Sequence, residues 1–393
     1  MRGHRELSVE QLLKSVQAAS GVAWSFPEDD LRLDGLRRLV AELAVNARRD
    51  AAKMQALRLD LSRLIAASLA VEADGEGPAP TTDQPQSGPL FVIGFGRTGS
   101  TFIHNLLALD PKARAPRLWE LWYPTPAPKP ESYADDRRIV LARSMLDYFE
   151  KASPLISQIH PMDAEGPDEC NHLMLHNTHL AMMYGAPGYW EWLKQLDNPQ
   201  LRRLFSHYRT QVHYLQRFFA GRRWLSKSLA HLHFLPVLFD VFPNAKVIRL
   251  HRDPCELVPS LCNLYANLRK LFQESVDPVG VGRMVSDVFL DGMDRMMRSA
   301  SDRTSRDHVD VMFREMIANP IGTVANIYAR FGYDYTPEFD RAMRHYLADA
   351  PKAMRSNHSY GLEEFGLTRK NLTERSESYL SWLHGRTGMS LVG

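Results

Sequence analysis

Apolar residues recur at helical spacing over most of the first 70 positions. Ser8 and Gln11 have the spacing of a helix capping box, and an amphipathic pattern runs from Leu36 to Ile65. We therefore expect residues 8–70 to be helical, within an N-terminal region of residues 1–71. Residues 72–89 contain several Gly and Pro residues without apolar periodicity, which predicts a linker.

A different pattern begins at Leu90, where a short apolar run, Leu90–Ile93, ends at a glycine and a helical pattern follows. This succession of strand, Gly-rich turn and helix typically opens an α/β domain. Three later apolar runs have the length of buried strands: Trp224–Ser226, Lys246–Leu250 and Val309–Phe313. For residues 90–393 the sequence predicts an α/β fold, with a P-loop-type parallel sheet flanked by helices and a site at the carboxyl ends of the strands.

The composition narrows the range of functions. The chain has 393 residues and a formal net charge of +2, which does not indicate a nucleic-acid partner but is compatible with a local basic pocket. Its three cysteines lack the spacing of metal ligands or of a disulfide framework, which favours a reducing, cytoplasmic location. The first ten residues lack the apolar core of a signal peptide, and no apolar run reaches the ~18 residues of a membrane span.

The turn after Leu90–Ile93 contains the first motif that carries chemistry. Gly94–Thr101 has the Gly-x4-Gly-x-Thr frame of a P-loop, whose glycines let the backbone wrap an oxyanion while helix N-terminal amides point at it. Ser100 replaces the Lys that reaches the outer phosphates of a nucleoside triphosphate, which argues against an ATPase or a GTPase. Arg97 is the candidate cation of this loop. The alternative is a tight turn that binds no ligand.

A second motif follows the predicted strand Lys246–Leu250. Arg252 lies just after the strand, and Ser260 lies just over one turn into a helix that we expect to start near Cys255. A guanidinium fork and a hydroxyl in this arrangement can converge on one phosphate. A surface ion pair for Arg252 and a solvent-facing Ser260 are the alternative interpretation.

Together the two motifs resemble those of the sulfotransferases that use 3′-phosphoadenosine 5′-phosphosulfate (PAPS), and most closely the bacterial branch of that family. The similarity covers roughly residues 88–370. Arg252 and Ser260 resemble the 3′-phosphate motif of the family, and Lys227 resembles the lysine that faces the transferring sulfate. The 5′-phosphosulfate loop of the family is similar to five consecutive residues: Arg97, Thr98, Gly99, Ser100 and Thr101.

This resemblance implies transfer of a sulfuryl group from PAPS to an acceptor hydroxyl or amine, with release of 3′-phosphoadenosine 5′-phosphate (PAP) and no metal. It implies that residues 97–101 bind the 5′-phosphate and that Arg252 and Ser260 bind the 3′-phosphate. Lys227 and Arg97 would stabilise the charge that develops during transfer.

The C-terminal region departs from the pattern of cytosolic relatives, because their Arg-Lys-Gly segment is missing. His358–Leu367 instead resembles a segment of the bacterial branch. The basic residue that closes on the nucleotide is therefore left open among Arg355, Arg369 and Lys370.

An acceptor hydroxyl also needs a general base, which is worth roughly 10²- to 10⁴-fold in rate. Glu120 resembles the base glutamate of protein-tyrosine sulfotransferases, which follows their phosphosulfate loop at nearly the same distance. His231 lies four residues after Lys227 and resembles, less closely, the histidine of cytosolic sulfotransferases. We prefer Glu120 and keep His231 as the alternative. A solvated carboxylate and a core histidine are the corresponding non-catalytic interpretations.

Two further groups of residues bear on the acceptor. His172, His176 and His179 have helical spacing, but no carboxylate or cysteine completes a known metal-ligand pattern, so we predict a pocket wall or a packing surface and no metal. Aromatic residues such as Trp119 and Trp122 favour an apolar or phenolic small-molecule acceptor.

Two other functions fit parts of the sequence. A P-loop small-molecule kinase fits the scaffold, but the absent Lys and the lack of a clear Walker-B strand argue against it. A non-catalytic protein that binds PAP or PAPS is the other alternative, and the presence of Arg97, Lys227 and Arg252 argues against it. The N-terminal helices are compatible with covering the core or with forming a homo-oligomer.

Overall fold

The computed structural model describes residues 7–20, 26–74, 88–154, 161–300, 307–349 and 361–388. The chain folds into two compact units. The first, here the helical unit, comprises residues 1–81, 117–218 and 264–277. The second, here the sheet unit, comprises residues 82–116, 219–263 and 278–393. Most of the predicted linker, residues 75–87, lies outside the described residues.

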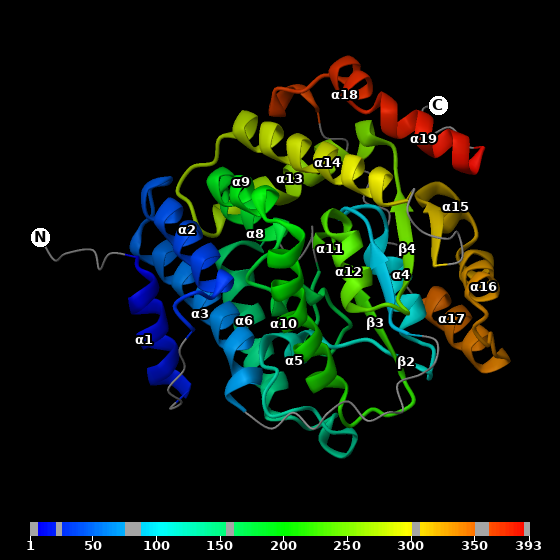
Figure 1. Ribbon diagram of the computed structural model, residues 1–393, viewed down its shortest axis with the longest axis horizontal. Helices are drawn as coiled ribbons and strands as arrows, with labels where there is room; N and C mark the ends of the chain where they lie inside the picture. The colour runs from blue at the N-terminus through cyan, green and yellow to red at the C-terminus, as the bar shows by residue number, and fades with distance from the viewer. Residues whose placement is uncertain are drawn as a thin grey trace, which may run out of the picture. The chain divides into compact units, whose positions relative to one another are not determined.

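The helical unit contains the helices predicted over residues 8–70, as α1 to α3. The amphipathic pattern from Leu36 to Ile65 is divided between α2 and α3. Asp50 is the N-cap of α3, because its side chain accepts the backbone N–H of Lys53 in the first turn of that helix. The elements of this unit are α1 (Val9–Ser20), α2 (Leu31–Val45), α3 (Ala51–Ala73), α5 (Leu118–Trp122), η1 (Pro130–Ser132), α6 (Arg137–Ala152), η2 (Cys170–Leu173), α8 (Thr178–Tyr184), α9 (Pro187–Gln195) and α10 (Asn198–Gln216) (Figure 1).

The sheet unit is built on a parallel sheet, as predicted. Its strands are β1 (Leu90–Ile93), β2 (Ala113–Arg114), β3 (Arg223–Lys227), β4 (Lys246–His251) and β5 (His308–Met312). They lie in the order β2-β3-β1-β4-β5, and every neighbouring pair is parallel. The four predicted strands are confirmed within one residue at each end, whereas the two-residue β2 was not predicted. Because parallel strands end at the same edge, β3, β1 and β4 bring Lys227, Gly94 and Arg252 to one edge of the sheet.

Helices of the sheet unit follow the strands along the chain, and α13 (Pro254–Lys270) contributes residues to both units. The remaining elements are α4 (Ser100–Leu107), α11 (Ala230–His233), α12 (Leu235–Val241), α14 (Pro278–Ala300), α15 (Phe313–Ala318), α16 (Pro320–Phe331), α17 (Pro337–Asp349), η4 (Glu363–Phe365), α18 (Arg369–Arg375) and α19 (Glu377–Thr387).

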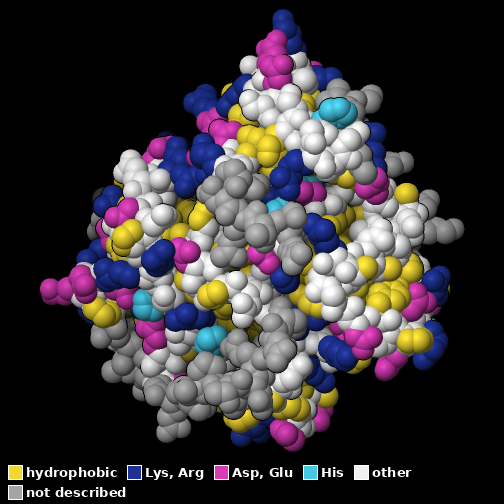
Figure 2. Space-filling model, turned by 45° about the vertical axis from the view of Figure 1, so that its right-hand side comes forward, with side chains coloured by type: hydrophobic (Ala, Val, Ile, Leu, Met, Phe, Trp, Pro, Cys, Tyr) yellow, Lys and Arg dark blue, Asp and Glu magenta, His cyan; other side chains and the backbone are white. Residues whose placement is uncertain are grey.

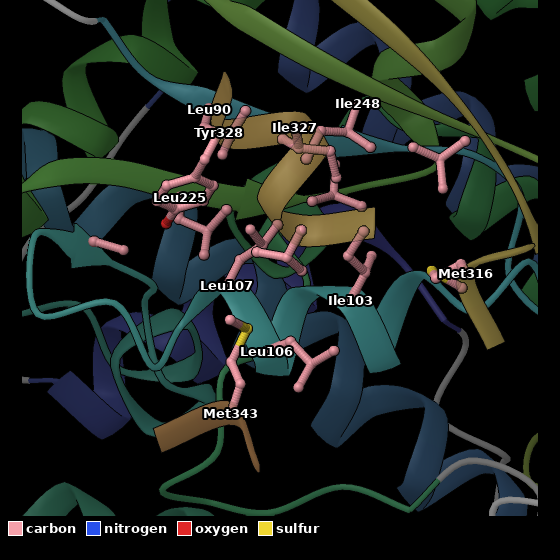
Figure 3. Packing of buried hydrophobic residues seen from close by; sticks show 14 of the residues in the cluster. Leu90, Ile103, Leu106, Leu107, Leu225, Ile248, Met316, Ile327, Tyr328 and Met343 are labelled. Carbon is pink, nitrogen blue, oxygen red and sulfur yellow. The ribbon is translucent and has the colours of Figure 1, made fainter. Parts of the chain in front are cut away.

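One face of the sheet packs against α4, α16 and α17 in an apolar cluster, which Figure 3 shows gathered around α4. Burying each large apolar side chain contributes roughly 1.5–3 kcal/mol, so this cluster fixes the strands and the helix that follows β1. Its main members are Leu90, Val92, Ile103, Leu106, Leu107, Leu225, Ile248, Leu250, Val311, Val324, Ile327, Phe339 and Met343.

The alternate residues of β4 and β5 form a polar layer on the opposite face. Arg249 donates to both carboxylate oxygens of Asp310 at 2.7 Å, and His251 Nε2 lies 2.9 Å from Asp310 Oδ1. The hydroxyl of Tyr379 in α19 lies 2.8 Å from His251 Nδ1. Burial alone would raise the pKa of Asp310, but hydrogen bonds and charges from His251 and Arg249 lower it strongly. These contacts hold the end of β4, one residue before Arg252.

The surface carries both signs of charge. Figure 2 shows Lys and Arg side chains interspersed with Asp and Glu side chains over the face that it presents, in keeping with the net charge of +2. Cys170, Cys255 and Cys262 are buried thiols that form no disulfide among the described residues. Among the described helices, none combines the length and the apolar character needed to cross a bilayer.

Candidate active site

The loop between β1 and α4 has a backbone that depends on left-handed residues. Gly94 and Gly99 have φ angles of 151° and 80°. A Cβ at Gly94 would meet Leu250 Cβ at 3.0 Å, and one at Gly99 would meet Met316 Cε at 2.3 Å. Arg97 has a φ angle of 70°, which costs on the order of 1 kcal/mol for a non-glycine residue. Strain of this kind is typical of ligand-binding loops.

This loop leads directly into the N-terminus of α4. Gly99 is the N-cap of α4, so the first amides of that helix and the positive end of its dipole face the loop. The side chain of Thr98 is buried and donates to the main-chain oxygen of Phe95 at 2.6 Å, which stabilises the turn. Lys227, at the end of β3, donates from Nζ to Thr101 Oγ1 at 2.9 Å. The predicted lysine and the predicted loop therefore lie together.

The second predicted motif meets the same loop. Arg97 Nε donates to Ser260 Oγ at 3.1 Å, and Arg252 Nη1 donates to the main-chain oxygen of Arg97 at 2.8 Å. Helix α13 starts at Pro254, and Asp253 Oδ1 accepts the N–H of Cys255 in its first turn. Ser260 is buried on this helix, with 8% of its surface exposed. The two motifs, more than 150 residues apart in sequence, are thus in direct contact.

Three residues near Arg252 were not assigned a role from the sequence: Glu256, Arg314 and Phe313. Glu256 Oε2 accepts from Arg252 Nε at 3.2 Å, and Glu256 Oε1 accepts from Arg314 Nη2 at 2.8 Å. The guanidinium of Arg252 also lies over the ring of Phe313, 4.4 Å from its centroid. The spacing of four residues between Arg252, just before α13, and Glu256, in its first turn, was a signal for the first pair. No local signal connects Glu256 with Arg314, because 58 residues separate them.

His231 lies in the interior of the sheet unit. Its side chain is fully buried in α11 and packs edge-on against the ring of Phe91, with the two centroids 5.2 Å apart. Burial lowers the pKa of His231 to about 3, so the imidazole is neutral at pH 7. This environment is typical of a packed core histidine.

Glu120 belongs to the helical unit, whereas the other predicted site residues belong to the sheet unit. It lies in α5 and is fully buried. Its carboxylate oxygen Oε2 accepts the backbone N–H of Arg117 at 2.6 Å and the hydroxyl of Tyr133 at 2.5 Å. Two donors therefore fix the orientation of this carboxylate, which is not the solvated group of the non-catalytic interpretation.

The three histidines at helical spacing pack against separate aromatic side chains. His172 lies edge-on to Trp122, His176 lies edge-on to Phe205, and Nδ1 of His179 lies 3.1 Å from the hydroxyl of Tyr265. In the described ranges of the chain, no three His, Cys, Asp or Glu side chains converge as metal ligands.

The candidates at the C-terminus differ in position. Arg355 lies outside the described residues. The main-chain oxygen of Arg369, at the start of α18, lies 3.9 Å from Cys255 Sγ, and Thr373 Oγ1 lies 3.4 Å from the same sulfur. Lys370 is 85% exposed, with Nζ 4.0 Å from Glu374. Of the described candidates, Arg369 thus has its main chain against the first turn of α13.

Comparisons with known proteins found a matching family model, similar sequences and similar structures. A family model described as the sulfotransferase family matches residues 89–337. The omega-hydroxy-beta-dihydromenaquinone-9 sulfotransferase Stf3 of Mycobacterium bovis is 24% identical over 297 residues, which are 74% of this chain and 74% of that protein. The crystal structure of sulfotransferase STF1 from Mycobacterium tuberculosis is 25% identical, with a TM-score of 0.80 over 95% of this chain and 99% of that chain. Sulfotransferase STF9 from Mycobacterium avium is 25% identical, with a TM-score of 0.84 over 97% of this chain and 98% of that chain.

Proposed function

Because the chain belongs to the sulfotransferase family and transfers a sulfuryl group, we propose that it takes this group from PAPS, the general donor of the family, and releases PAP. In this proposal residues 97–101 bind the 5′-phosphosulfate, and Arg252 and Ser260 bind the 3′-phosphate. No metal takes part, because arginine, lysine and backbone amides supply the positive charge.

One observation carries the proposal: Arg97 contacts both residues of the second motif, Ser260 through its side chain and Arg252 through its main-chain oxygen. The site therefore combines two guanidinium groups, a hydroxyl and the amides of a helix N-terminus. A nucleotide with a phosphate at both the 3′ and the 5′ position provides an anion for each motif, whereas AMP provides one anion only. These hydrogen-bond donors therefore suit PAPS, which carries a phosphate group at each of the two positions.

Lys227 is proposed to act on the bond that breaks. In an in-line transfer, the bond between sulfur and the oxygen of the 5′-phosphate breaks, and a new bond forms between sulfur and the acceptor oxygen. Negative charge then develops on the departing phosphate oxygen. In this proposal that charge is stabilised by Arg97 and by Lys227, whose Nζ lies 2.9 Å from Thr101 of the loop.

Glu120 is proposed as the general base that takes the proton of the acceptor. Its carboxylate is held in one orientation by the N–H of Arg117 and the hydroxyl of Tyr133, and a positioned carboxylate can act as a general base. His231 is the weaker candidate, because a fully buried imidazole with a pKa of about 3 is a poor proton acceptor at neutral pH.

The acceptor is proposed to be a small apolar molecule that carries a hydroxyl group. Stf3 is named for an omega-hydroxy dihydromenaquinone, which is a lipid-like alcohol. The helical unit of the present chain contains Trp119, Trp122, Trp190 and Trp192, in keeping with an apolar or phenolic acceptor.

Calorimetric titration of the whole protein with PAP, AMP and ATP·Mg²⁺ tests the donor site. We expect PAP to bind tightly without metal and AMP to bind weakly. Loss of charge-assisted hydrogen bonds in Arg252→Ala should weaken PAP binding by about 10- to 100-fold and leave AMP binding nearly unchanged. Equal losses for both nucleotides would show that Arg252 does not bind the 3′-phosphate. A preference for ATP·Mg²⁺ would favour the kinase alternative.

A further inference from the structure

A carboxylate joins two arginines beside the 3′-phosphate motif. Glu256, in the first turn of α13, accepts from Arg252 at 3.2 Å and from Arg314 at 2.8 Å. The two arginines come from different segments, since Arg252 follows β4 and Arg314 lies in α15. The site therefore has an additional negative and an additional positive charge that the proposed PAPS contacts do not use.

Two hydrogen bonds and a ring fix the direction of Arg252. Its Nε donates to Glu256, its Nη1 donates to the main-chain oxygen of Arg97, and its guanidinium lies 4.4 Å over the ring of Phe313. Among the described residues, Nη2 of Arg252 makes no hydrogen bond, so its two N–H groups can donate to a ligand. A guanidinium already held in place loses less conformational entropy when it binds a phosphate.

The same carboxylate is a like charge for any phosphate that Arg252 binds. Burial alone would raise the pKa of Glu256, but hydrogen bonds from Arg314 and Arg252 lower it overall, so the group is ionised at neutral pH. Arg314 supplies a second positive charge to Glu256. Its side chain is 64% exposed, and burial therefore contributes little to its position.

We propose that Glu256 and Arg314 are positioning residues for the 3′-phosphate: Glu256 holds Arg252, and Arg314 neutralises Glu256 so that the carboxylate does not repel the phosphate. This proposal rests on the proposed function, in which Arg252 binds the 3′-phosphate of PAP and PAPS. The proposal requires that the effects of Glu256 and Arg314 on PAP affinity depend on each other, which a role in packing alone would not produce. Removal of the carboxylate must restore the binding that is lost when Arg314 is removed.

The test is a set of PAP and AMP affinities measured by calorimetry at low salt. Arg314→Ala should weaken PAP binding by about three- to fivefold and leave AMP binding unchanged. The double variant Glu256→Gln/Arg314→Ala should bind PAP more tightly than Arg314→Ala does. Glu256→Gln should also bind PAP more tightly than Glu256→Ala, because the amide oxygen of Gln still accepts from Arg252. High salt should reduce the effect of Arg314→Ala, because salt screens exposed charges.

Arg344→Ala is the matched control. Arg344 is also 64% exposed and pairs with a carboxylate, Asp340, but in α17, so its removal should not change PAP affinity. Wild-type protein that binds PAP no more tightly than AMP would overturn the proposed function and this inference with it. Wild-type protein that prefers PAP, together with unchanged PAP affinity in Arg314→Ala or no recovery in the double variant, would overturn this inference alone.

Discussion

Two buried histidines make the sheet unit sensitive to acid. Burial lowers the pKa of His231 to about 3 and that of His233 to about 4. In the unfolded chain both should titrate near pKa ~6.5. At pH 7 both histidines are largely neutral in the folded chain and in the unfolded chain, so their protonation has little effect on stability. As the pH falls below ~6.5, the unfolded chain binds protons that the folded chain does not bind, and the folded state is destabilised.

The size of this effect at pH 5 can be calculated, because pH 5 lies between the pKa values of the histidines in the folded chain and in the unfolded chain. That pH lies about 1.5 units below the unfolded pKa, and each unit is worth about 1.36 kcal/mol, so each histidine should lower the free energy of unfolding by about 2 kcal/mol. The pKa values of His231 and His233 in the folded protein have little influence on this free-energy difference, because both lie below pH 5 and the two imidazoles stay largely neutral there. Together the two residues should destabilise the protein by about 4 kcal/mol.

Urea unfolding at pH 7 and pH 5 measures this loss in the wild-type protein and in His231→Leu. Leucine is apolar and does not titrate, so the variant should lose about 2 kcal/mol less than the wild type between the two pH values. Other titrating groups contribute to both proteins and cancel in the difference. If the free energy of unfolding fell equally in the two proteins between pH 7 and pH 5, burial of His231 would not be the cause of the acid sensitivity. Near-normal turnover of His231→Leu at pH 7 would also leave Glu120 as the base.

Two predictions concern turnover, measured as PAP release from PAPS with an acceptor found by screening apolar alcohols and phenols. Glu120→Gln should keep its affinity for PAP while kcat falls by roughly 10²- to 10⁴-fold, and Glu131→Gln, which changes an exposed carboxylate, should behave as the wild type. Near-normal turnover of Glu120→Gln would remove Glu120 as the base. Lys227→Met should lower kcat by about 10²- to 10³-fold with a smaller effect on PAP affinity, because the ammonium acts most strongly on charge that develops in the transition state. A loss confined to PAP affinity would contradict this role.

The local pattern of the sequence was sufficient to locate four strands of the sheet and the loop that follows β1. Short apolar runs predicted β1, β3, β4 and β5, because the strand residues that pack in the apolar cluster must be apolar. The spacing of Gly94 and Gly99 predicted a loop in which glycines let the backbone turn tightly, and both residues have positive φ angles. Once these strands are parallel, Lys227 and Arg252 must end at the same edge as the loop.

The features that depend on contacts between distant segments were decided by the tertiary structure. The grouping of the N-terminal helices with residues 117–218 depends on which apolar faces pack together, and helical periodicity alone does not choose the partner of a face. The burial of His231 against Phe91, with its lowered pKa, has the same origin.

The charge pair between Glu256 and Arg314 is decided in the same way, because only the pairing of β4 with β5 brings the helices that follow these strands together. The sequence by itself therefore determined the elements of the site and the chemistry of its residues, which depend on short-range patterns. The tertiary structure decided which charges meet there and how each is solvated, since these properties depend on long-range packing.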